Sequence, residues 1–255
     1  MVKQNSYKSV IILYKYYMAL VELEVSIPQE LSAIKLQQYQ KYLSVAKNVD
    51  EGDKNNEFLN LKALEIFCGL SLKDSYNLPV SMFDSVLKQL GDCFNEKTEF
   101  VQRFKMTGSD GVTAEFGFIP NLDKMSFGEY IDLESYISDW DNMHKAMAVM
   151  YRPIVAGKKH LYQIEDYEGS DKWADVMKDA PVNVAMAAIV FFYRLGSKLS
   201  KYTMNSLLEE EEKKGNTALK QVLDENGVGI NQFMDLLQEM STNLTQLPKF
   251  HYTPA

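Results

Sequence analysis

The sequence predicts an α+β fold that is predominantly α-helical: a helical bundle around a buried central helix, with one β-hairpin and a short N-terminal strand. Three observations predict it. The stretch at about 181–203 is apolar on all sides over VAMAAIVFF, as a central buried helix requires. Two segments within 99–119 flank a Gly-Ser-Asp-Gly sequence suited to a tight turn. Most of the remaining chain carries apolar residues at helical spacing.

The N-terminal strand is predicted by strict alternation. Apolar residues at 21, 23, 25 and 27 are separated by Glu22, Glu24 and Ser26, and Pro28 ends the run. The segment before Met18 resembles a signal sequence, but Lys15 interrupts its apolar part and no small-residue cleavage site follows. A natural start at Met18 instead of Met1 is the alternative, and N-terminal sequencing of natively expressed protein would distinguish the two.

The first half of the chain then predicts three helices. A stripe of apolar and aromatic residues at Leu36, Tyr39, Leu43 and Ala46 predicts a helix at 34–46, and a polar loop follows at 48–56. The segment 57–70 is a strong helix with Gly69 near its end, and 72–78 reads as a connector. Pro79 suits the start of a helix over 80–90.

In the second half, Ser126 and Glu129 have the spacing of a capping box, which predicts a helix from there through Tyr136. Another helix is expected from Asp141 to Tyr151, because the residue before Pro153 disfavours the helical conformation. A short strand at 161–164, a helix from 170 or 171 to 178, and the central helix opened by Pro181 complete the main part.

Two domains are expected: residues 1–204 as the main helical domain with the β-hairpin, and residues 205–255 as a helical C-terminal tail. The tail is more polar, and Gly227-Val228-Gly229 separates two predicted helices within it. Its charged run at 209–214 is typical of a solvated helix face.

Composition excludes several classes of function. A net charge of −8 and a pI near 5.0 argue against direct binding of nucleic acid, which needs a basic face. The longest uncharged apolar run, Val184–Tyr193, is half of what a bilayer span requires, so no membrane contact is expected. Cys68 and Cys93 are too few and too far apart for a disulfide scaffold or a zinc site.

Motifs of common enzymes are absent from the sequence. There is no phosphate-binding glycine loop and no nucleophile elbow, and the three histidines are far apart. We therefore expect no metal, no cofactor and no enzymatic activity. The alternative is a small enzyme with an acid–base site near Glu129, Asp132 and His144. Acidic residues at a helix start are also favoured by the helix dipole, without any catalysis.

The segment from Phe116 to Tyr162 is dense in aromatic residues and methionine. Such residues supply contact area at protein interfaces, and they also form ordinary cores. On the first interpretation, six residues of this segment are candidates for a protein–protein interface: Tyr130, Trp140, Met143, Met147, Tyr151 and Arg152. Arg152 has an alternative role, which is to bind the last carbonyls of the preceding helix.

The order of landmarks along the chain adds a resemblance. ELEVSIP leads to LQQYQKYL, and the predicted hairpin ends in FGFIPNLDKMSFGEYIDLESYI. DWDNMHKAMAVMYRPI, YQIEDYEGS and PVNVAMAAIVFFYRLGSKL follow. Over roughly residues 18–203 this resembles uncharacterised morphogenesis and virion proteins of tailed bacteriophages, including crAss-like phages. The best-matched pieces are Phe118-Ile119-Pro120, Gly128–Leu133, Asn142–His144 and Tyr151-Arg152-Pro153.

The resemblance implies a non-enzymatic virion protein of the tail or neck region, which works through protein–protein contacts in virion assembly. Its implied partners are other phage structural proteins, and it is expected to form a homo-oligomer or part of a ring. It would be assembled in the host cytoplasm and reside in the virion. The alternative within this class is a tail assembly chaperone that is absent from the mature virion.

Overall fold

In the computed structural model, residues 7–16, 19–49, 57–107, 113–158 and 161–195 are described. The chain divides into two compact units with the boundary after Ala185. The first unit holds every element discussed below except the continuation of the last helix. The predicted tail, residues 205–255, lies outside the described residues.

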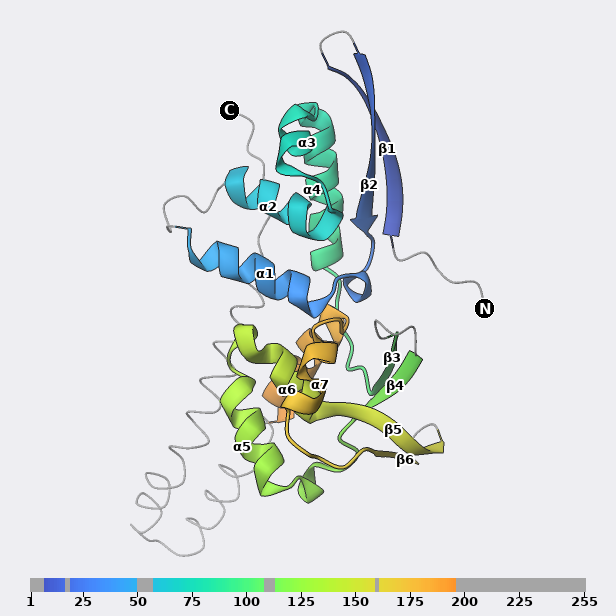
Figure 1. Ribbon diagram of the computed structural model, residues 1–255, viewed down its shortest axis with the longest axis vertical. Helices are drawn as coiled ribbons and strands as arrows, with labels where there is room; N and C mark the ends of the chain where they lie inside the picture. Colours follow the sequence, from blue (N-terminus) through green and yellow to red (C-terminus); the bar gives the residue numbers. More distant parts are fainter. Residues whose placement is uncertain (1–6, 17–18, 50–56, 108–112, 159–160, 196–255) are drawn as a thin grey trace, which may run out of the picture. The chain divides into compact units, whose positions relative to one another are not determined.

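The fold is mixed α+β and rich in helix, as predicted, with two small antiparallel sheets (Figure 1). The first sheet pairs β1 (Tyr7–Tyr16) with β2 (Ala19–Pro28) along their full length. The sequence predicted β2 but not β1. The two residues between the strands are Tyr17 and Met18, and the pair lacks the glycine, asparagine or aspartate that usually marks a two-residue hairpin turn.

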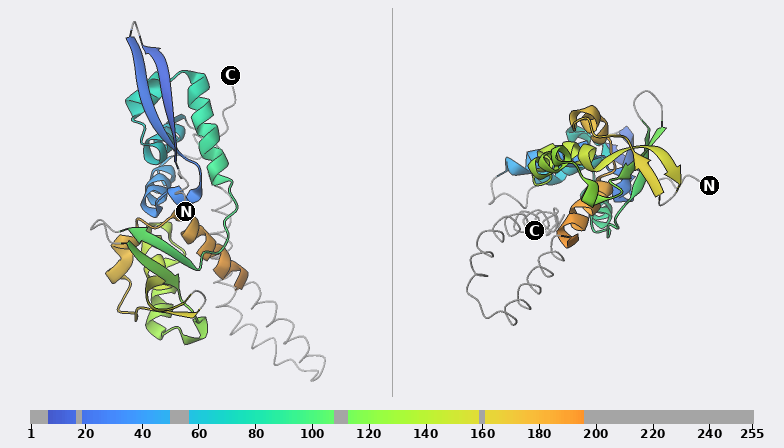
Figure 2. Two further views of the ribbon diagram at one scale, coloured as in Figure 1. Left: turned by 90° about the vertical axis from the view of Figure 1, so that its right-hand side faces the viewer. Right: turned by 90° about the horizontal axis from the view of Figure 1, so that it is seen from below.

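Four helices belong with this hairpin. They are α1 (Leu36–Lys47), preceded by a 3₁₀ turn, η1 (Leu31–Ala33), then α2 (Glu57–Cys68), α3 (Leu72–Asn77) and α4 (Val80–Phe94). β2 buries Val25 and Ile27 and contacts α2 and α4. Figure 2 shows the hairpin alongside α4.

Aromatic side chains hold α1, α2 and α4 together. The ring of Phe94 lies 5.1 Å from that of Phe67 and 6.2 Å from that of Tyr39. Tyr42 in turn contacts Phe67 with ring centroids 5.4 Å apart. The predicted stripe on α1 is therefore correct at Leu36 and Tyr39, but Tyr42 is buried where Leu43 was expected. Such pairs add to the free energy of burial, by about 0.5–1.5 kcal/mol each.

Several helix boundaries in this part differ from prediction. Residues 72–78, expected to be a connector, contain α3, because the Ser71 hydroxyl accepts a hydrogen bond from the Asp74 backbone N–H and caps the helix. α4 continues to Phe94, beyond the expected end at residue 90, since Cys93 and Phe94 are buried. α2 ends at Cys68, two residues before the expected end, and Gly69 follows it with φ of +69°, a conformation that glycine adopts without strain.

The second sheet has the strand order β3-β4-β5-β6. The predicted hairpin is confirmed as β3 (Arg103–Thr107) and β4 (Thr113–Phe118); its turn lies outside the described residues. β5 (Tyr151–Lys158) pairs with β4 and with β6 (Leu161–Ile164). β6 was predicted and β5 was not, because Pro153 within it suggested only a helix end.

Short helices complete the first unit. These are η3 (Leu122–Lys124), α5 (Phe127–Tyr136), η4 (Trp140–Asn142), α6 (Met143–Met150) and α7 (Asp171–Met177). α6 contacts both α5 and α7. The capping box at Ser126 and Glu129 is present as predicted, and the helix expected from residue 141 begins as the 3₁₀ turn η4.

The predicted central helix is helical from residue 182 to 195, where the described residues end. Within the first unit, Val182 donates its N–H to the Ile34 carbonyl at 2.8 Å, and Val182, Val184 and Ala185 are buried. The residues that continue the helix are also buried: Met186, Ala187, Ala188, Ile189 and Phe192. Its expected end near residue 203 lies outside the described residues.

Candidate functional site

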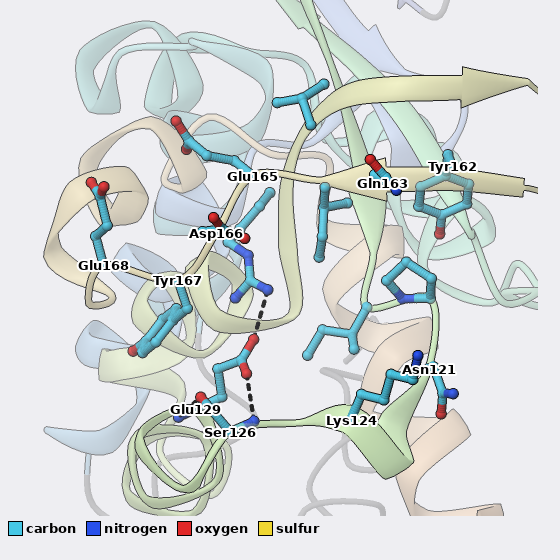
Figure 3. Close-up of a pocket in the computed structure, with 15 residues that line it drawn as sticks. Asn121, Lys124, Ser126, Glu129, Tyr162, Gln163, Glu165, Asp166, Tyr167 and Glu168 are labelled. Atoms are coloured by element: carbon cyan, nitrogen blue, oxygen red, sulfur yellow. Dashed lines mark hydrogen bonds and ion pairs between the residues drawn. The ribbon is translucent and has the colours of Figure 1, made fainter.

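A pocket of about 910 Å³ lies in the first unit between residues 119–129 and residues 162–168 (Figure 3). Its volume is within the range typical of ligand sites. One wall comes from the turn between β4 and α5, and the other from β6 and the segment after it. Arg152, from β5, lines it between these walls.

A buried ion pair joins α5 to β5 at this pocket. Arg152 Nη2 lies 2.6 Å from Glu129 Oε1, and the two side chains are only 7% and 8% exposed. The other Glu129 oxygen accepts the Ser126 backbone N–H at 2.7 Å, so the carboxylate that caps α5 also holds the arginine. Burial raises the pKa of Glu129, but the hydrogen bonds from Ser126 and the charge of Arg152 outweigh it and lower that pKa.

Of the other two guanidinium nitrogens of Arg152, one has a hydrogen-bond partner among the described residues. Nη1 donates to the Val149 carbonyl at 3.3 Å, near the end of α6, which agrees with the alternative role suggested from the sequence. The guanidinium carbon lies 5.3 Å from the centre of the Tyr167 ring. Arg152 Nε is buried and has no hydrogen-bond partner among the residues that the structure describes.

Tyr167 extends this cluster to a second carboxylate. Its hydroxyl donates to Asp132 Oδ2, one turn along α5 from Glu129. Burial and the bond to Asp132 raise the pKa of Tyr167, so its hydroxyl stays protonated as a donor. The sequence did not identify Tyr167 as a site residue.

The wall after β6 is acidic. Glu165, Asp166 and Glu168 lie at one end of the pocket, while Lys124 and Asn121 lie at the other (Figure 3). Glu165 accepts the Trp173 indole N–H at 2.6 Å, and Lys172 bridges Glu165 and Glu168 at 3.0 and 2.6 Å. With Glu129 included, the pocket lining carries more carboxylates than cations, since only Lys124 and Arg152 of its described residues are basic.

The six interface candidates have very different positions. Tyr130 is 52% exposed on α5. Met143, Met147 and Tyr151 have no exposed surface, and Trp140 and Arg152 are 7% and 6% exposed. Met143, Met147, Tyr151 and Trp140 pack in the interior of their own chain, so the expectation that they form a partner surface needs correcting. Arg152 is also buried, but it lines the pocket. Methionine at helical spacing marks a core here, the alternative that the sequence left open.

Among the core candidates, the aromatic residues have specific contacts. Trp140 packs edge-on against Tyr39 of α1, with ring centroids 4.9 Å apart. The Tyr151 hydroxyl donates to the Val101 carbonyl at 2.7 Å, and its ring contacts Phe104 and Phe118.

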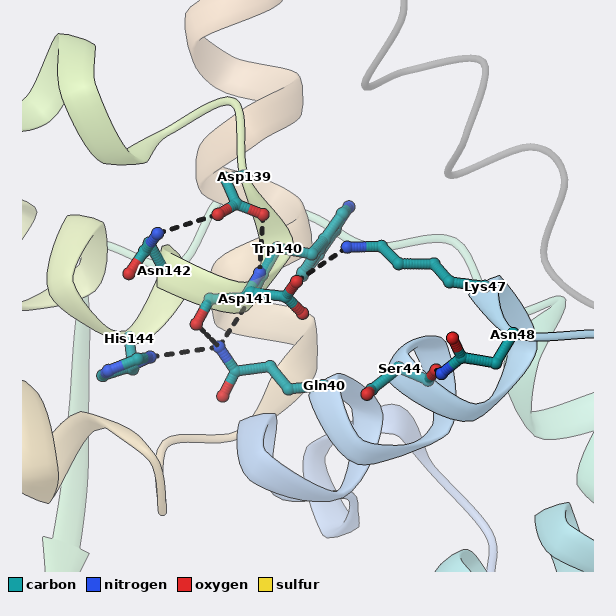
Figure 4. Close-up of polar contacts among 9 residues, drawn as sticks. All are labelled: Gln40, Ser44, Lys47, Asn48, Asp139, Trp140, Asp141, Asn142 and His144. Carbon is teal, nitrogen blue, oxygen red and sulfur yellow. Dashed lines mark hydrogen bonds and ion pairs between the residues drawn. The ribbon is translucent and has the colours of Figure 1, made fainter.

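Glu129, Asp132 and His144 do not converge as a triad. His144 belongs to a separate polar network with α1, in which Gln40 Nε2 lies 2.6 Å from the Trp140 carbonyl and 3.1 Å from His144 Nδ1 (Figure 4). Burial and the nearby Lys178 and Lys145 lower the pKa of His144.

Within the described residues, no group of three or more histidine, cysteine, aspartate or glutamate side chains is arranged to hold a metal ion. In the same part of the chain, none of the helices has both the length and the apolarity needed to cross a membrane.

The sequence found part of this site. The capping-box spacing located Glu129, and Arg152 was a candidate for a different reason. The acidic segment after β6 was noticed only as the landmark YQIEDYEGS; its run of carboxylates was the available signal. Its place opposite α5 depends on β5, the strand that the sequence did not predict.

Comparison of this chain with models of known protein families, with curated proteins and with solved structures gives no match.

Proposed function

We propose that this chain is a non-enzymatic virion protein of the tail or neck region of a tailed bacteriophage, acting through contacts with other phage structural proteins. The assignment to phage rests on the resemblance of the sequence landmarks. One structural observation supports a role in protein–protein contact, and it overlaps Gly128–Leu133, one of the four best-matched pieces.

That observation is an exposed apolar stripe on α5. Phe127, Tyr130 and Ile131 are 80%, 52% and 42% exposed, and their spacing of three and four residues places them on one face of the helix. The opposite face buries Glu129 and Leu133. A helix buried on one side by its own chain and apolar on the other is typical of an element that contacts a partner.

Quantitative mass spectrometry of purified virions of the encoding phage tests the proposal. Detection at a stoichiometry comparable to the portal or tail proteins would support a virion component. Absence from virions with abundance in infected-cell lysate would overturn it, in favour of the tail assembly chaperone.

A substitution series tests the stripe itself. Phe127→Ser and Tyr130→Ser should weaken incorporation into virions without lowering the melting temperature, because both side chains already face solvent. Tyr76→Ser is the matched control, since Tyr76 is 74% exposed on α3, away from the stripe. If all three variants are incorporated equally, α5 is not the contacting surface.

A further inference from the structure

We infer that the Arg152 pocket is a docking site for an extended, basic segment of a partner protein, which pairs its main chain with the edge of β6 and places lysine or arginine against the acidic wall. The inference rests on the proposed function in taking a protein as the partner, and it adds the chemistry of that partner. Three observations carry it.

The first is the Nε–H of Arg152, which has no acceptor among the described residues. The residue is 6% exposed and lines the pocket, and a buried donor without an acceptor costs free energy. Nε itself is buried, so a ligand that supplies an acceptor recovers that cost only when the Arg152 side chain shifts toward the pocket. Since Glu129 already neutralises the guanidinium charge at 2.6 Å, a neutral carbonyl oxygen suits Nε better than an anion does.

The second observation is the charge of the lining. A phosphate or carboxylate ligand would meet Glu165, Asp166 and Glu168, and like charges repel. A cationic side chain would instead be attracted. Lys172 already bridges Glu165 and Glu168, and Asp166 is an exposed carboxylate between them in the sequence.

The third observation is that seven consecutive residues, 162–168, all line the pocket. β6 is the edge strand of its sheet and ends at Ile164, and residues 165–168 continue the wall outside any strand. Glu165 donates its N–H to the Pro153 carbonyl of β5 at 2.9 Å. Its neighbour Ile164 therefore turns its N–H and C=O away from β5, toward the open edge of the sheet.

Together these features match the recognition of an extended peptide by strand addition. Main-chain bonds to the sheet edge give affinity, and alternate side chains give specificity. A carbonyl of the peptide main chain is the neutral acceptor that suits Arg152 Nε, and its basic side chains face the acidic wall. The partner segment is therefore extended and carries lysine or arginine at alternate positions.

The experiment uses the full chain and a fluorescein-labelled heptapeptide of alternating valine and lysine, acetylated and amidated at its ends. Its counterpart carries glutamate in place of each lysine. By fluorescence anisotropy, we expect the lysine peptide to bind more tightly, with an affinity that falls as salt is added. Shifts in the amide resonances of residues 162–168 would locate the binding.

Two chain variants and one peptide variant separate the contributions. Asp166→Asn with Glu168→Gln should weaken the lysine peptide about three- to tenfold, as expected for exposed ion pairs. Asp92→Asn, an exposed carboxylate on α4, is the matched control and should leave affinity unchanged. N-methylation of the peptide main chain should weaken binding if strand pairing takes place.

Equal binding of the lysine and glutamate peptides, no binding of either, or an affinity unaffected by the Asp166 and Glu168 changes would overturn the inference. Those outcomes are independent of the virion measurement. If the chain is found in virions but does not bind the lysine peptide, the proposed function stands and the docking site is refuted. If the chain is absent from virions but binds the peptide, the docking site stands and the proposed function is refuted.

Discussion

The ion pair between Glu129 and Arg152 can be removed by substituting either residue. The losses in the free energy of unfolding caused by the two substitutions should not add when the substitutions are combined. Glu129→Gln keeps an oxygen that can accept the Ser126 N–H, so the capping box survives. It leaves Arg152 as a buried, unpaired charge. Because both side chains are less than a tenth exposed, we expect a loss of about 3–5 kcal/mol in the free energy of unfolding.

Arg152→Met removes the cation instead and leaves the carboxylate of Glu129 with the Ser126 hydrogen bonds alone, at a similar cost of about 3–5 kcal/mol. The double variant carries no unpaired charge. Its loss should therefore be smaller than the sum of the single losses by roughly 0.5–3 kcal/mol. Urea unfolding followed by circular dichroism measures all three, with Lys105→Met, an exposed cation on β3, as the control.

The pH dependence gives an independent check with a definite sign. The pKa of Glu129 is lowered in the folded chain, so its contribution is fully present above the ordinary glutamate pKa and is lost as pH falls through the lowered value. The acid limb of stability should therefore be shallower in Glu129→Gln. Single variants that cost less than about 1 kcal/mol, or strictly additive losses, would refute the reasoning.

Three further predictions concern packing, strand pairing and the thiols. Gly117→Ala should destabilise by about 1–3 kcal/mol, because a Cβ there would lie 2.4 Å from Tyr162 Cε2, whereas the control Gly128→Ala meets nothing closer than 4.0 Å; urea unfolding compares them. A chain begun at Met18 lacks β1 and leaves β2 unpaired, so it should self-associate in size-exclusion chromatography, and a monomeric, equally stable product would contradict this. Burial raises the pKa of both Cys68 and Cys93 to about 12. Alkylation of these thiols by iodoacetamide at pH 8 should therefore be at least about a hundredfold slower in the folded chain than in urea. Fast labelling of the folded chain would show that the thiols are accessible and would contradict this.

The sequence predicted the elements whose signals are local. The alternation of β2, the capping box at Ser126 and the glycine after α2 each depend on a few neighbouring residues, and each is present. β1 and β5 were not predicted. The residues between β1 and β2 are atypical of a turn sequence, and β5 contains Pro153 and follows a helix directly.

In the candidate site, too, local features could be predicted from the sequence and long-range contacts could not. Its charged residues are visible in the sequence, but their gathering depends on long-range strand pairing that periodicity does not encode. Glu129 meets Arg152 across 23 positions, and Asp132 meets Tyr167 across 35, so neither pair has a local signature. The methionine stripe of α6 fits a core and an interface equally well, and only its burial decides between them.

The junction between α6 and β5 has a consequence for how the molecule opens. Met150 ends the helix and Tyr151 begins the strand, with no connecting residue, and the Met150 carbonyl accepts the Ile119 N–H at 3.0 Å. A fluctuation that unwinds the end of α6 therefore also disturbs the start of β5 and the hydrogen bond between Met150 and Ile119. We expect α6, β4 and β5 to exchange their amide hydrogens as one cooperative unit, with a shared opening free energy.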